Sequence, residues 1–91
     1  MMRAEILDKA KKIVTTGRNA QYGEPEDNFA NIAMLWSAYL YKTIESRDVA
    51  AMMILLKLAR IKGTRVSDDN WVDIAGYAAC GGEVEECNGA L

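Results

Sequence analysis

The hydrophobic pattern is dominated by residues 49–61, VAAMMILLKLARI, in which only Lys57 and Arg60 are charged. The segment is too long for one strand and is rich in Ala, Met and Leu, which favour helix. A helix that is apolar on nearly every side is typical of the middle of a bundle. A membrane span needs about 18 apolar residues. This shorter segment with two charges therefore predicts a buried helix and no membrane span.

Amphipathic segments precede this central helix. Residues 3–16 carry an apolar stripe through Ile6, Ala10 and Ile13, and the spacing predicts a helix that Gly17 ends. A second helix is expected to begin at Pro25, which suits a first helical turn. Its apolar stripe consists of Phe29, Ile32, Ala33, Trp36 and Leu40, widened by Met34, Leu35, Ala38 and Tyr41. This helix should therefore touch more than one neighbour, and its aromatic residues Trp36, Tyr39 and Tyr41 are expected at core and interface positions.

Capping residues indicate where the last two helices begin and end. Ser46 is suited to N-cap the central helix and Gly63 to end it. Ser67 is suited to N-cap a fourth helix, which Gly81-Gly82 is expected to stop. The acidic residues 83–91 then form a mobile C-terminal tail. The sequence thus predicts an all-α fold, a small four-helix bundle within a single domain of residues 1–82.

Length, composition and charge exclude several classes of function and indicate self-association. A chain of 91 residues with 51% hydrophobic content builds only a thin core, so apolar surface is expected to remain for an identical copy to cover, as in a homo-oligomer. A net charge of −2 and a pI near 5.0 do not fit a general nucleic-acid binder. The absence of histidine excludes Ser-His-Asp and Cys-His catalysis within one chain, and the usual zinc sites.

The cysteines and the N-terminus bear on the compartment. Cys80 and Cys87 lack CxxC spacing and are interpreted as free thiols in a reducing cytosol. The N-terminus is charged from Arg3 onwards and has no apolar segment of the kind found in signal peptides. A cytoplasmic location is therefore expected.

Charged residues on the last two helices form the first candidate site. Lys57 and Arg60 are three apart and share one helical face, while Asp69, Asp73 and Tyr77 repeat every four residues. The simplest interpretation is a pair of antiparallel helices whose opposite charges meet in a common cleft. The charges are either a buried ion-pair network that fixes helix register or part of a ligand site.

The loop at residues 17–25 provides further candidates. It contains two glycines, an asparagine and a proline, and loops of this kind often carry function. Arg18 offers a planar cation and Tyr22 an aromatic donor. Alternatively, Tyr22 packs onto the bundle and Arg18 caps a carbonyl.

Three blocks of sequence resemble a known family. They are YGEPEDNF at residues 22–29, preceded by Arg18, then LKLAR at 56–60 and DNWVDIAGYA at 69–78. Together they resemble a family of small proteins from phages and prophages over roughly residues 15–80. A more distant likeness is to the nucleotide-modification-associated domains and the MazG-like all-α nucleotide pyrophosphohydrolases. The family resemblance implies a protein that works in the cytoplasm of an infected or lysogenic host.

The distant likeness implies Mg²⁺-dependent cleavage of nucleoside triphosphates, in which an EExxE motif and an ExxD motif hold the metals. This chain has no EExxE, and its ExxD from Glu45 to Asp48 lies at an expected helix start. Under this alternative Asp69, Asp73 and either Glu26 or Asp27 would bind Mg²⁺. Lys57 would steady the leaving phosphate. No cofactor is otherwise expected.

Three functions are therefore weighed, and the first is preferred. A nucleotide-binding module would use Arg18, Lys57, Arg60 and Arg65 on phosphates, Tyr22 or Trp71 against a base, and Asp73 to orient a basic side chain, with Asp69 and Tyr77 beside it. It would modulate nucleotide pools or sequester a nucleotide signal of host defence. The second function is the pyrophosphohydrolase. The third is an oligomeric protein that binds and blocks a host defence enzyme.

Overall fold

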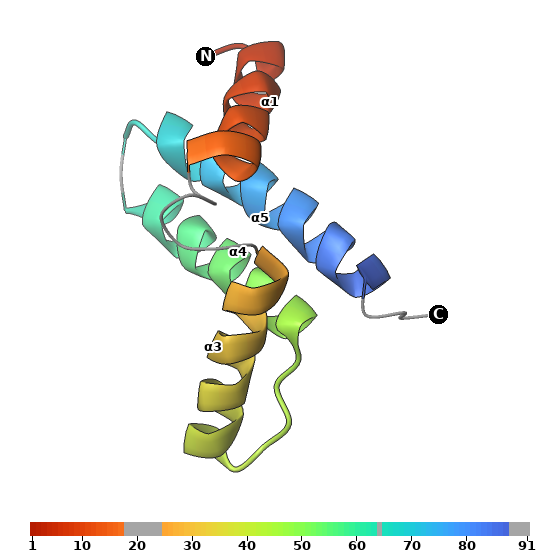
Figure 1. Cartoon of the computed structure of the whole chain (residues 1–91). Helices are drawn as coiled ribbons and strands as arrows, with labels where there is room; N and C mark the ends of the chain where they lie inside the picture. Colours follow the sequence, from red (N-terminus) through yellow and green to blue (C-terminus); the bar gives the residue numbers. More distant parts are fainter. Residues whose placement is uncertain (18–24, 64, 88–91) are drawn as a thin grey trace.

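The computed structural model describes residues 1–17, 25–63 and 65–87. Its helices are α1 (Arg3–Lys12), continued by the π-helical turn η1 (Ile13–Gly17), then α3 (Pro25–Leu40), α4 (Ser46–Lys62) and α5 (Asp68–Cys87) (Figure 1). The described residues contain no strand, so the predicted all-α fold with four helices is confirmed.

Helices α4 and α5 form the centre of the molecule. They run antiparallel and side by side, as the sequence predicted, and the other two helices pack against this pair (Figure 1). Helix α1 crosses the first part of α5. Helix α3 contacts the beginning of α4 and then extends away from the pair, so its last turns have few neighbours.

The core is built from small side chains where α3, α4 and α5 meet. Its buried members are Phe29, Ala33, Val49, Ala50, Tyr77 and Val84. The largest side chains that are fully buried are all valines, as expected for a thin core in a short chain. The rings of Phe29 and Tyr77 stack with their centroids 6.3 Å apart, which links α3 to α5.

Helix α4 begins one residue earlier than the sequence suggested. Ser46 was expected as the N-cap, but it is the first helical residue and is buried, and Glu45 occupies the capping position. The Asp48 carboxylate accepts a hydrogen bond of 2.8 Å from the Glu45 backbone N–H. This contact stabilises the first turn. Gly63 ends α4 as predicted.

Helix α5 does not stop at Gly81-Gly82, so that prediction was wrong. It continues to Cys87 because Val84 is 1% exposed and packs in the core. Gly81 lies against α4, where a Cβ would come within 2.9 Å of Ala50. A glycine at this position therefore serves close helix packing and does not end the helix. Residues 83–87 are helical, and 88–91 lie outside the described part of the chain.

An ion pair between Arg47 and Glu85 connects the start of α4 with the end of α5. Arg47 Nη1 lies 3.0 Å from Glu85 Oε1, and Arg47 Nε lies 3.5 Å from Glu45 Oε2. The hydrogen bond and charge of Glu85, with smaller contributions from Glu45 and Asp48, raise the pKa of the Arg47 guanidinium.

None of the helices in the described ranges combines the length and apolar character needed to cross a membrane.

Candidate functional site

One contact of the predicted charged cleft is present. Lys57 Nζ on α4 lies 2.9 Å from Asp73 Oδ2 on α5. Their side chains are 13% and 26% exposed, so most of each charge is removed from water. Each charge then depends on the other for compensation. The pair thus joins the two central helices across their interface.

Arg60 and Asp69 do not join this pair, which corrects the expectation that all four charges share one cleft. Asp69 Oδ1 lies 3.4 Å from Lys9 Nζ, because α1 crosses α5 at this point. Arg60 is exposed, and within the described residues it has no ion-pair partner. A spacing of three residues turns Arg60 about 60° from Lys57 around the helix, so its side chain leaves the interface with α5.

The remaining predicted site residues are spread over different environments. Tyr77 is a core residue stacked on Phe29, and Trp71 is 46% exposed near the start of α5. Arg18 and Tyr22 lie outside the described residues. Among the predicted ligand-binding residues that the structure describes, Lys57 and Asp73 are joined by an ion pair, whereas Asp69 pairs with Lys9 on α1.

No cluster of three acidic, cysteine or histidine residues suited to a metal occurs in the part of the chain that the structure describes. Asp69 and Asp73 each face a lysine, on α1 and on α4 respectively. The Mg²⁺ site of the hydrolase alternative stays a prediction.

The end of α3 has a feature that sequence reasoning missed. Tyr41 follows the last residue of α3 with φ of 54°, in the left-handed region. The Lys42 N–H bonds the Ser37 carbonyl at 3.2 Å, which is the six-to-one hydrogen bond of a Schellman motif. In this motif the position that Tyr41 occupies is usually glycine, sometimes asparagine. A tyrosine there is unusual, and its side chain is 96% exposed.

The chain leaving Tyr41 is held in place by Ser37. The Ser37 hydroxyl accepts a hydrogen bond of 2.8 Å from the Ile44 N–H and donates one of 3.2 Å to the Ile44 carbonyl. Both bonds are partly buried. They fix the turn between α3 and α4 and therefore the direction of the residues within it.

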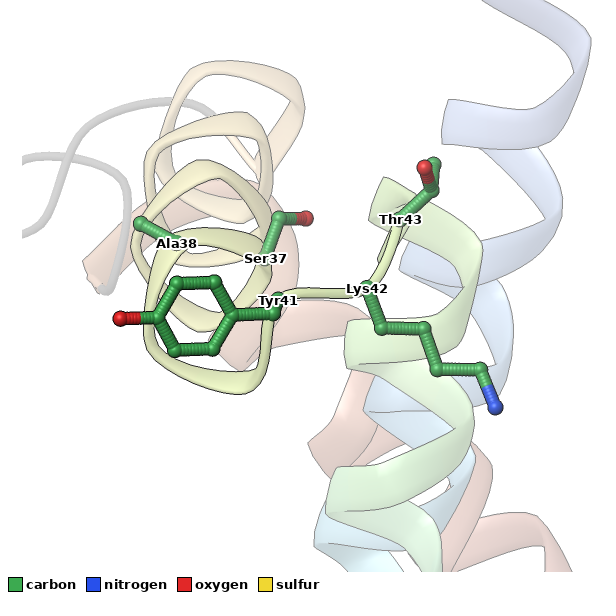
Figure 2. A pocket seen from close by; sticks show the side chains of 5 residues that line it. All are labelled: Ser37, Ala38, Tyr41, Lys42 and Thr43. Atoms are coloured by element: carbon green, nitrogen blue, oxygen red, sulfur yellow. The ribbon is translucent and has the colours of Figure 1, made fainter.

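An open hollow lies at this turn, lined by Ser37, Ala38, Tyr41, Lys42 and Thr43. Figure 2 shows the Tyr41 ring at the end of α3 and the Lys42 side chain extending the opposite way. The turn therefore presents an aromatic group and a cation on two different sides.

We define the α3 tip as the exposed residues Leu35, Tyr39, Leu40 and Tyr41. Leu35 and Tyr39 are one turn apart on the same side of α3, and Tyr39 is 83% exposed. The sequence placed Leu40 in the core stripe and the two tyrosines at core and interface positions. The structure leaves Leu40 half exposed, because α3 extends beyond α4. No local signal in the sequence placed the end of α3 at Leu40, so the unusual position of Tyr41 could not be inferred.

The fold and these surfaces define a small all-helical protein with a thin core and exposed apolar residues. The family model described as "Domain of unknown function (DUF6378)" matches residues 5–85, and the chain belongs to this family.

Two relatives connect the family to phages, in agreement with the sequence resemblance. The chain is 48% identical over 79 residues to the Gene 55 protein of Mycobacterium phage D29, covering 87% of this chain and 52% of the relative. It is 45% identical over 75 residues to the Gene 55 protein of Mycobacterium phage L5, covering 80% and 47%. The chain thus spans about half the length of these curated relatives. No solved structure matches it.

Proposed function

We propose that this chain is a protein-interaction factor that docks onto a partner protein through the α3 tip. The observation that carries the proposal is Tyr41, a fully exposed aromatic residue in a left-handed backbone conformation. Such an outlier is a reason to look for function, because the surrounding structure must tolerate its cost.

The energetics of Tyr41 favour a use outside the folded chain. A left-handed conformation costs a residue with a Cβ roughly 1–2 kcal/mol, and glycine avoids this cost. The ring recovers little of this cost through packing, because it is 96% exposed. The side chain therefore does little for the fold, and contact with another molecule explains its presence.

The composition of the α3 tip indicates the chemistry of the partner surface. Tyrosine rings give large contact areas with few torsions to restrain, and they are enriched among the residues that dominate binding energy. We expect an apolar pocket on the partner, with an acceptor for a phenol hydroxyl.

The phage relatives supply the setting for such a partner. The form of docking that we propose is the blocking of a defence enzyme of the infected cell. This role, like any activity of the longer relatives as whole proteins, is part of the proposal.

A capture experiment tests the docking function. Leu35 on the α3 tip and Leu7 on α1 are both 63% exposed, so Leu35→Glu and Leu7→Glu are matched substitutions at different surfaces. The immobilised chain and both variants are exposed to lysate of a mycobacterium that carries Mycobacterium phage D29, the source of one relative, and bound proteins are quantified by mass spectrometry.

We expect at least one protein that the wild type and Leu7→Glu retain equally. Leu35→Glu should lose this protein by roughly tenfold or more, the effect of removing one residue that dominates binding. Equal recovery with all three chains would refute the α3 tip as the docking site.

Nucleotide binding is the second candidate, and one observation favours it. Arg60, Lys62 and Arg65 are exposed where α4 passes into α5, close in sequence to the half-exposed Trp71. Among the residues that the structure describes, none of these three cations has a carboxylate partner. Phosphate oxygens would suit unpaired guanidinium groups, and an exposed indole ring would suit a base.

Fluorescence titration tests this candidate. A nucleoside triphosphate bound where α4 passes into α5 should quench the fluorescence of Trp71. Arg60→Ala should weaken nucleotide binding by roughly tenfold or more, because charge-assisted hydrogen bonds contribute strongly to affinity. A Trp71→Phe variant separates this signal from that of Trp36. Adding Mg²⁺ and assaying pyrophosphate tests the hydrolase alternative in the same samples. A titration without any change in the wild type would rule out this candidate.

A further inference from the structure

Helix α4 has a second apolar side, which faces away from α5. Its inner side contributes the core residues Val49, Ala50, Met53 and Ile54. Its outer side consists of the exposed residues Ala51, Met52, Leu55, Leu58 and Ala59. Leu55 lies at the centre of this outer side and is 63% exposed. We call these five residues the α4 outer face.

The α4 outer face reads the same in both directions from Leu55. Alanines lie four residues before and after it, at 51 and 59, and large apolar residues lie three before and after it, at 52 and 58. Steps of three, four and seven residues keep these positions on one side of a helix. A reversed copy of α4 therefore presents the same order of small and large side chains, as a two-fold interface requires.

The ends of this face carry opposite charges at equal distances from the centre. Asp48 lies seven residues before Leu55, and Lys62 lies seven residues after it. In an antiparallel pair, Asp48 of each copy meets Lys62 of the other, and each helix N-terminus meets a C-terminus. In a parallel pair, each charge meets its own kind. Charge complementarity and the helix dipoles therefore both favour the antiparallel arrangement.

Small side chains on the α4 outer face suit a helix–helix contact. The alanines at positions 51 and 59 allow two helix backbones to approach closely.

We propose that two copies of this chain associate through their α4 outer faces, antiparallel, with the two-fold axis beside Leu55. The α3 tip is a separate surface, so a dimer of this kind carries two of them. The inference does not depend on the docking function.

Sedimentation of the full chain tests the dimer. The wild type should sediment at twice 10.1 kDa, and Leu55→Glu should raise the dissociation constant by at least roughly a hundredfold, because two carboxylates then meet at the axis. Leu7→Glu changes an equally exposed leucine on α1 and should leave the dimer intact. Ala59→Glu provides a second disruption of the same face if circular dichroism shows that Leu55→Glu is unfolded.

Lys62→Glu tests the orientation. In the antiparallel dimer the new carboxylate of each copy lies against Asp48 of the other, so two like-charge contacts form, and association should weaken by roughly tenfold or more. In a parallel dimer one like-charge pair would merely replace another, and association would not change. A monomeric wild type, a Leu55→Glu variant that is folded and still dimeric, or an unaffected Lys62→Glu variant would each overturn the proposal.

Discussion

At the residue scale, Lys57 and Asp73 show how one polar contact can hold a thin helical core together. The two side chains meet at 2.9 Å across the α4–α5 interface and are mostly buried. Removal of either partner leaves the other charge without its counter-ion and mostly shielded from water. The pair therefore matters more to stability than the surface ion pair between Lys9 and Asp69.

Substitution of the pair should destabilise the fold measurably. Asp73→Ala and Lys57→Met are each expected to lower the free energy of unfolding by about 1–3 kcal/mol, below the 3–5 kcal/mol of a fully buried pair. The double variant should lose less than the sum, because the second substitution removes the stranded charge. Urea unfolding followed by circular dichroism measures all three.

Arg60→Ala serves as the control for this cycle, since an exposed side chain away from such contacts changes stability by about 0.5 kcal/mol or less. Equal losses in Asp73→Ala and Arg60→Ala would contradict a special role for the buried pair.

The contact between α4 and α5 could be predicted from the sequence, whereas the ion pair of Asp69 could not. The apolar segment around Lys57 and the four-residue repeat of Asp73 and Tyr77 were enough to infer two adjacent helices with a contact between them. The partner of Asp69 could not be inferred, because Lys9 comes from a helix sixty residues away whose crossing point is set by tertiary packing. Tyr41 was also missed as an outlier, since its backbone conformation depends on where α3 ends.

At the element scale, the two consecutive glycines of α5 have different surroundings. A Cβ on Gly81 would lie 2.9 Å from the Ala50 Cβ, whereas a Cβ on Gly82 would meet nothing within 4 Å. Gly81 thus permits the close packing of α4 and α5, while Gly82 only lowers helix propensity.

Alanine at these two positions should have opposite effects. Gly82→Ala is expected to raise the free energy of unfolding by about 0.5–1 kcal/mol. Gly81→Ala should lower it by about 1–3 kcal/mol, because the added methyl forces the two helices apart. Thermal melts followed by circular dichroism compare them directly. Stabilisation by both substitutions would mean that α5 does not approach α4 as closely as described.

The end of α5 shows why the residue types near a helix end were not enough to predict where the helix stops. Two glycines followed by acidic residues are typical of a helix end and a tail. The helix continues because Val84 gains burial and Glu85 pairs with Arg47, and both contacts come from distant parts of the chain. Helix number and the antiparallel central pair could be predicted from periodicity, whereas this boundary could not.

At the scale of the whole molecule, the chain is more open than a packed four-helix bundle. Its radius of gyration is 13.7 Å, against about 12 Å for a compact domain of this length. The last turns of α3 extend from the central pair (Figure 1), so residues that would form a core elsewhere are exposed at the α3 tip. Two exposed apolar surfaces result: the α3 tip, which we propose binds a partner protein, and the α4 outer face, which we propose binds a second copy.

The central claim is that Tyr41 is retained for binding at a cost to stability. The most direct test measures unfolding free energy and partner capture side by side for the wild type and Tyr41→Gly. Glycine relieves the left-handed strain without loss of packing, so the variant should be more stable by about 1 kcal/mol and should fail to capture the partner. A variant that is less stable, or that captures the partner as well as the wild type does, would contradict the account.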